Sequence, residues 1–87
     1  MYRFEYGSQK STLSREKHGI DFLESQALWD APDIVEIKAK SNTESRFLVI
    51  GKINKKHWSA VITYRDENIR IISVRRSRKT EVKLYEG

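Results

Sequence analysis

Four short stretches rich in apolar residues follow one another after Pro32, and they limit the folds that this chain can adopt. The stretches are IVEIKAK (34–40), RFLVIG (46–51), HWSAVITY (57–64) and IRIISVR (69–75). Alternation of apolar and polar residues indicates half-buried strands, and the nearly continuous run 46–51 indicates a central strand. The gaps SNTES, INKK and RDEN are short and polar, which is typical of hairpins. This half of the chain therefore predicts an antiparallel β-meander.

The residues before Pro32 predict one short strand and a first helix. Tyr2, Phe4 and Tyr6 alternate with polar residues, as in a strand. Ser8 is a suitable N-cap for a helix over roughly 9–18, and Gly19 suits the left-handed position that follows a helix.

Two further helices complete the predicted fold. Asp21 and Glu24 have the spacing of a capping box, and Pro32 prevents the helix that they begin from continuing. Residues 77–86 predict a short C-terminal helix in which Val82 and Tyr85 face inward. The predicted class is α+β, in one domain over residues 1–87, with the helices packed on one face of the sheet.

The composition excludes several classes of site. The chain has 87 residues and no cysteine, so disulfides, zinc–thiolate sites and cysteine nucleophiles are excluded. No apolar run approaches ~18 residues, so no membrane-spanning segment is predicted. The N-terminal MYRFEY lacks the apolar region of a signal peptide. We expect a cytoplasmic protein with no cofactor, no metal and no membrane partner.

The distribution of charge indicates a polyanionic partner. The net charge is +5, and residues 69–80 contain five basic residues and no acidic one. These residues are Arg70, Arg75, Arg76, Arg78 and Lys79. A basic segment of this kind is typical of proteins that bind nucleic acid or an acidic protein.

An ordered series of short motifs runs along nearly the whole chain. They include F-x-Y, K-H-G-I-x-F, T-Y-R, I-R-I-I-S-x-R-R and E-x-x-x-Y. The residues that carry the series are Phe4, Tyr6, Lys10, Lys17 to Ile20, Phe22, Trp29, Asp30, Pro32, Arg46, Ile50, Gly51, Thr63 to Arg65, Ile69 to Ser73, Arg75, Arg76, Glu81 and Tyr85. The series resembles the BrnT toxins of type II toxin–antitoxin pairs.

This resemblance implies a RelE-like fold and a metal-independent endoribonuclease activity that inhibits growth. It also implies neutralisation by a cognate BrnA-like antitoxin in a hetero-oligomer, with DNA contacted only through the antitoxin.

Cleavage of RNA without a metal can use the 2′-hydroxyl of the RNA as the nucleophile. Such a site needs a base for that hydroxyl, cations for the charge on phosphorus and an acid for the leaving 5′-oxygen. The catalytic candidates are Lys17, His18, Arg65, Glu67 and Arg75. Alternative roles remain open, because Lys17 and His18 would also stabilise a helix C-terminus and Arg65 and Glu67 would be solvated in a turn.

The candidates for RNA binding are Arg70, Arg76, Arg78, Lys79 and Tyr85. Each has a structural alternative. Arg70 lies within an apolar strand and could pair with a carboxylate such as Glu5 or Glu36, because an unpaired buried guanidinium is costly. Arg75 and Arg76 are expected to point to opposite faces of the sheet. Tyr85 could simply pack the C-terminal helix.

The remaining aromatic and imidazole side chains have structural interpretations. Trp29 and Trp58 are expected in the core, and His57 is expected at the surface. The rival interpretation of the whole chain is a non-catalytic basic module that binds RNA or assembles with a DNA-binding partner.

Overall fold

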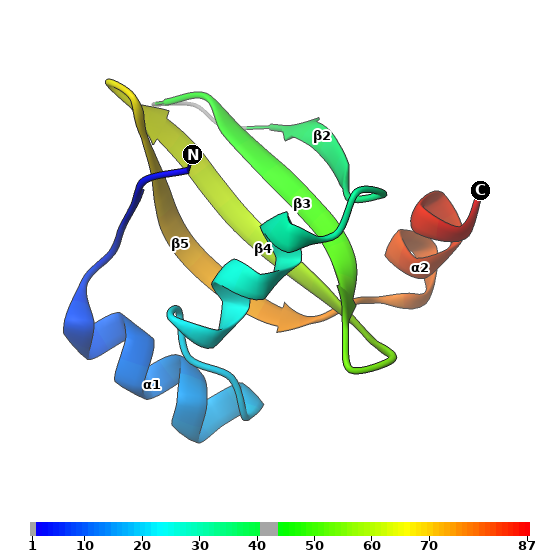
Figure 1. The fold of residues 1–87 in the computed structure, drawn as a ribbon, viewed down its shortest axis with the longest axis horizontal. Helices are drawn as coiled ribbons and strands as arrows, with labels where there is room; N and C mark the ends of the chain where they lie inside the picture. The colour runs from blue at the N-terminus through cyan, green and yellow to red at the C-terminus, as the bar shows by residue number, and fades with distance from the viewer. Residues whose placement is uncertain (1, 41–43) are drawn as a thin grey trace.

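The computed structural model describes residues 2–40 and 44–87 (Figure 1). The element order is β1 (Phe4–Glu5), α1 (Ser8–His18), the 3₁₀-helix η1 (Glu24–Asp30), β2 (Val35–Ala39), β3 (Arg46–Ile53), β4 (Lys56–Arg65), β5 (Asn68–Arg76) and α2 (Lys79–Glu86). The α+β class is confirmed. No helix in these ranges is long and apolar enough to cross a membrane. Residues 41–43, within the predicted turn SNTES, lie outside the described part of the chain.

The five strands form one mixed sheet in the order β1-β5-β4-β3-β2. Strands β2 to β5 pair with their neighbours in antiparallel fashion. Strand β1 pairs parallel to β5, with Phe4 opposite Ile69 and Glu5 opposite Arg70. The sequence did not predict this parallel pairing, because periodicity marks a strand but does not identify a partner more than sixty residues away.

The hydrophobic core lies between one face of the sheet and the segment that contains η1. Val49, Ala60 and Ile62 are fully buried on that face, where Phe22 and Leu28 pack against the sheet. Trp29 and Trp58 are 7% and 8% exposed, which confirms that both belong to the core.

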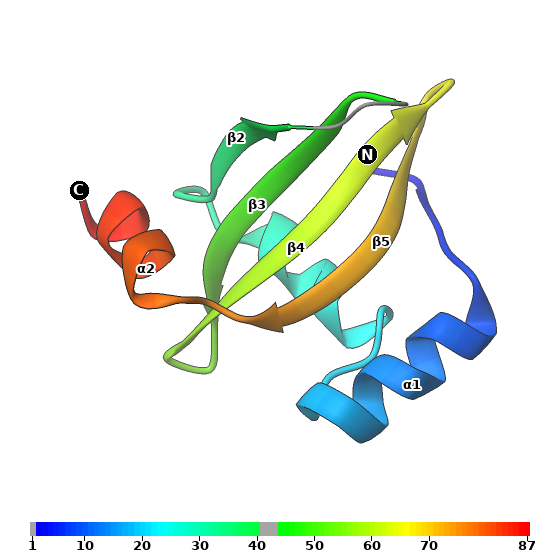
Figure 2. The same ribbon diagram turned by 180° about the vertical axis from the view of Figure 1, so that it is seen from behind.

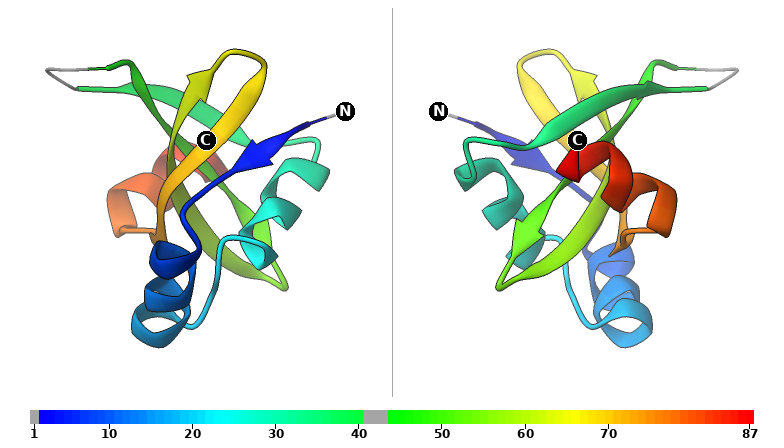
Figure 3. Two further views of the ribbon diagram at one scale, coloured as in Figure 1. Left: turned by 90° about the vertical axis from the view of Figure 1, so that its left-hand side faces the viewer. Right: turned by 90° about the vertical axis from the view of Figure 1, so that its right-hand side faces the viewer.

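Helix α2 lies on the other face of the sheet, seen from behind in Figure 2 and from the sides in Figure 3. Its Glu81 accepts a hydrogen bond from Ser59, and its Tyr85 packs edge-on against His57. Ser59 and His57 alternate with the core residues Trp58 and Ala60, so they point away from the core. The prediction of helices on one face is therefore wrong for α2, because polar contacts with Ser59 and Arg75 draw it to the opposite side.

The ends of the first two helices follow the local sequence in most respects. Gly19 has φ +81° and donates its N–H to the Arg15 carbonyl, so the predicted left-handed cap is confirmed. Glu24 and Asp21 exchange backbone-to-carboxylate hydrogen bonds of 2.7 and 3.1 Å, as a capping box does. Ser8 is wrong as the N-cap, because Gly7 occupies that position and Ser8 is the first helical residue.

Candidate RNA-binding surface

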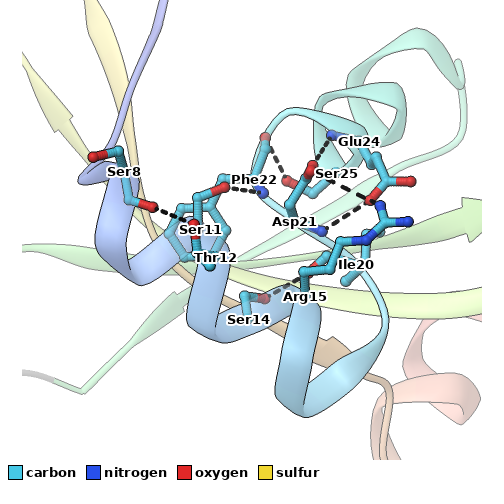
Figure 4. Close-up of polar contacts among 10 residues, drawn as sticks. All are labelled: Ser8, Ser11, Thr12, Ser14, Arg15, Ile20, Asp21, Phe22, Glu24 and Ser25. Carbon is cyan, nitrogen blue, oxygen red and sulfur yellow. Dashed lines mark hydrogen bonds and ion pairs between the residues drawn. The ribbon is translucent and has the colours of Figure 1, made fainter.

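Buried serines fix the turn that follows α1 (Figure 4). Ser14 donates a hydrogen bond of 2.7 Å to the Ile20 carbonyl, and Ser11 accepts one of 2.9 Å from the Phe22 N–H. Arg15 adds an ion pair with Glu24 across the same turn. The chain therefore leaves α1 in one direction, and the preceding Lys17 and His18 are held at a defined helix end.

A cleft of about 160 Å³ lies between α1 and β5. Its basic side chains are Lys10, Lys17 and His18, and residues 72–74 of β5 form part of the opposite wall. Lys10, Lys17 and His18 are all exposed, and no acidic residue lines the cleft. Lys10 was not among the predicted site residues, although its spacing of seven from Lys17 places both on one side of a helix.

Arg75 is held by a carboxylate from α2. Its Nη1 and Nη2 each donate a hydrogen bond of 2.7 Å to Glu81, which also accepts bonds from Ser59 and from the backbone N–H of Arg78. These bonds lower the pKa of Glu81 to about 2, and the hydrogen bonding from Arg75 has the largest effect. Burial of Glu81 acts in the opposite direction. The same contact raises the pKa of Arg75. The Arg75 guanidinium is therefore already engaged by an internal anion.

Arg65 and Arg70 gather around Glu5 at the other end of β5. Glu5 lies 3.3 Å from Arg70 and 3.8 Å from Arg65, and it accepts a hydrogen bond from Asn68. The Asn68 amide, with the two guanidinium groups, lowers the pKa of Glu5. The structural alternative for Arg70, an ion pair with Glu5, is therefore present. Arg65 keeps a side chain that is 57% exposed.

Arg76 and Tyr85 both make contacts with strand β4. The Arg76 guanidinium lies 5.5 Å from the ring centroid of Trp58, on the face opposite to Arg75, as expected. Tyr85 packs against His57. The pKa of the Tyr85 phenol is raised, mainly by burial and secondly by a hydrogen bond with Asp33.

His57 is half-buried rather than fully exposed, and its Nε2 lies 2.6 Å from a carboxylate oxygen of Glu86. The expectation of a surface histidine therefore fits only in part.

The predicted site residues do not converge on one point. Lys17 and His18 line the α1–β5 cleft, and Arg75, Arg76, Arg78 and Lys79 follow at the end of β5 and the start of α2. Arg65 and Glu67 lie at the turn before β5. That turn is roughly 25 Å from Arg76, measured along the strand. Both Arg78 and Lys79 are exposed, as is Glu67. Among residues 2–40 and 44–87, no three His, Cys, Asp or Glu side chains are grouped as a metal site would require.

These residues lie on a small α+β domain with a basic cleft beside its last strand, an arrangement suited to an anionic polymer. Residues 6–81 match the model of a family described as "Ribonuclease toxin, BrnT, of type II toxin-antitoxin system". The chain belongs to this BrnT family, since the match covers most of its 87 residues. A comparison with curated proteins gives no match.

Proposed function

We propose that this chain is a metal-independent endoribonuclease toxin that binds single-stranded RNA along β5, with the α1–β5 cleft at the site of cleavage. The observation that carries the proposal is the acid-free cleft lined by Lys10, Lys17 and His18 in a member of a ribonuclease toxin family. A RelE-like fold and a cytoplasmic location are part of the same proposal.

The proposed reaction needs no group from outside the chain and the RNA. The 2′-oxygen attacks the adjacent phosphorus, the bond from phosphorus to the 5′-oxygen breaks, and a 2′,3′-cyclic phosphate forms. The proton of the 2′-hydroxyl leaves to a base, and the departing 5′-oxygen gains one from an acid. His18 serves one of these proton transfers, while Lys10 and Lys17 stabilise the added negative charge on phosphorus.

The other predicted basic residues would bind RNA on either side of the cleft. Arg76, Arg78 and Lys79 would hold phosphates beyond the end of β5. Arg65 and Arg70 would hold them near its start. Arg75 is engaged by Glu81, so we assign it to positioning α2 and the end of the strand as well as to phosphate binding.

Control of the toxin completes the proposal. A cognate BrnA-like antitoxin would occupy the basic surface in a toxin–antitoxin hetero-oligomer, since complementary charge favours an acidic segment there. The toxin would contact DNA only through that antitoxin.

The test uses purified protein and end-labelled single-stranded RNA in EDTA. We expect cleavage that leaves 2′,3′-cyclic phosphate or 3′-phosphate ends and that stops when antitoxin is added. His18→Gln and Lys17→Gln should each lower the rate by about 10²-fold with little change in thermal stability, because both side chains are exposed.

Lys38→Gln removes an exposed lysine from β2 and serves as the control, which should cleave at the wild-type rate. Cleavage that EDTA abolishes and magnesium restores would overturn the mechanism. Binding of RNA without any cleavage would favour the non-catalytic module instead.

A further inference from the structure

The β3–β4 hairpin has a lysine in a backbone conformation that favours glycine. Ile53 pairs with Lys56, so the loop consists of two residues, Asn54 and Lys55. Their φ angles are +51° and +71°. Positive φ at both central residues defines a type I′ turn, in which asparagine is favoured first and glycine second. Asn54 fits this preference, whereas Lys55 carries a steric cost that glycine would not.

The strain at Lys55 coincides with a cluster of cations. Lys55 and Lys56 are exposed and form no ion pair with any residue in the described ranges. Lys52, on the same hairpin, pairs with Glu86 at 3.5 Å. The Glu86 carboxylate also pairs with His57. It forms no ion pair with Lys55 or Lys56, so it does not compensate the charges at the tip of the hairpin.

The hairpin projects beyond the end of β5. Trp58 is the β4 residue opposite Arg76, the last residue of β5. Lys55 lies three residues before Trp58, which places the tip roughly 10 Å past the last pair of residues. Figure 1 shows this hairpin at the end of the sheet where β5 ends, and α1 lies at that end as well. The exposed Arg78 and Lys79 follow β5 directly.

We propose that Lys55 and Lys56 form a second phosphate-binding element, which extends the RNA surface beyond β5. This inference rests on the proposed function for its ligand class, single-stranded RNA. The hairpin contacts the sugar–phosphate backbone and carries no base specificity, since its cations are lysines on a tip without an adjacent aromatic side chain in the loop. The strained backbone at Lys55 persists because the charge is used in binding.

Lys55→Gly separates binding from stability. Glycine relieves the strain, so the thermal midpoint should be equal to or above that of the wild type. Loss of one phosphate contact should lower the slope of log affinity against log salt by about 0.7 for a single strand. If wild type and variant bind equally at 1 M salt, this difference in slope makes the variant bind about fivefold more weakly at ~0.1 M salt.

The probe is a fluorescein-labelled single-stranded RNA of ~16 nucleotides with every 2′-hydroxyl methylated, measured by anisotropy. Asn54→Gly changes the same turn without changing charge, and it should bind as the wild type does. Lys55→Arg keeps the charge and should retain both affinity and salt slope.

Wild-type affinity and salt slope in Lys55→Gly would overturn the inference. Weaker binding by Asn54→Gly as well would also overturn it, because the effect would then come from the turn. If Lys55→Gly weakens antitoxin binding but not RNA binding, the hairpin belongs to the antitoxin interface and the inference fails. Failure of the proposed function is distinct: the wild type would then bind the methylated probe yet leave ordinary RNA uncleaved.

Discussion

Replacing Glu81 by Gln should destabilise the fold strongly, although the change keeps the shape of the side chain. Glu81 is 7% exposed and accepts four hydrogen bonds, two of them from Arg75. Its pKa falls from 4.5 to about 2 in the folded protein. At 1.36 kcal/mol for each pKa unit, the ionised form stabilises the fold by about 3 kcal/mol. The change also leaves the half-buried Arg75 guanidinium without a carboxylate partner, which acts in the same direction.

We therefore expect Glu81→Gln to lose about 3 kcal/mol in urea unfolding at pH 7, with a fall in melting temperature of roughly 12–24 °C. The pH dependence has a defined sign. Because the folded pKa is lowered, the stabilisation is complete above pH 4.5 and is lost as the pH falls toward 2. The wild-type and variant stabilities should converge over that range.

Glu67→Gln is the matched control, since it makes the same chemical change at an exposed turn residue, and its stability should equal that of the wild type. Two results would refute the reasoning. One is a Glu81→Gln variant as stable as the control at pH 7. The other is a stability deficit that is the same at pH 2 and pH 7, which would show that the carboxylate charge is not its cause. Arg75→Ala should resemble Glu81→Gln, so a loss of toxicity in that variant must be corrected for lost stability.

Two further predictions concern the turn that holds Lys17 and His18. Gly19→Ala should cost about 1 kcal/mol, because φ is +81°, and should reduce RNA cleavage in the folded protein; unchanged stability in urea would contradict the left-handed cap. Ser14→Ala should cost about 1–3 kcal/mol, because the buried hydroxyl donates to the Ile20 carbonyl. Thr12→Ala, at an exposed hydroxyl on the same helix, is its control, and equal melting temperatures for the two variants would refute the role of Ser14.

The local signals in the sequence were sufficient for most of the secondary structure. Gly19 ends α1, and Asp21 with Glu24 begins the next helical segment, because each signal acts between residues a few positions apart. The short polar gaps INKK and RDEN predicted turns for the same reason. The basic residues that follow β5, and Lys17 with His18 at a helix end, were likewise visible from sequence, and their roles remain predictions.

Only the tertiary structure decided how these parts combine. The parallel pairing of β1 with β5, and the choice of the outer face by α2, depend on contacts between residues far apart in sequence. The Arg75–Glu81 pair follows from that placement, although the residues are only six positions apart, because a strand end and a helix must first be brought together. Lys10 entered the cleft because α1 packs beside β5. Periodicity defines which residues are buried in each element, whereas the elements' partners are set by the packing of the whole chain.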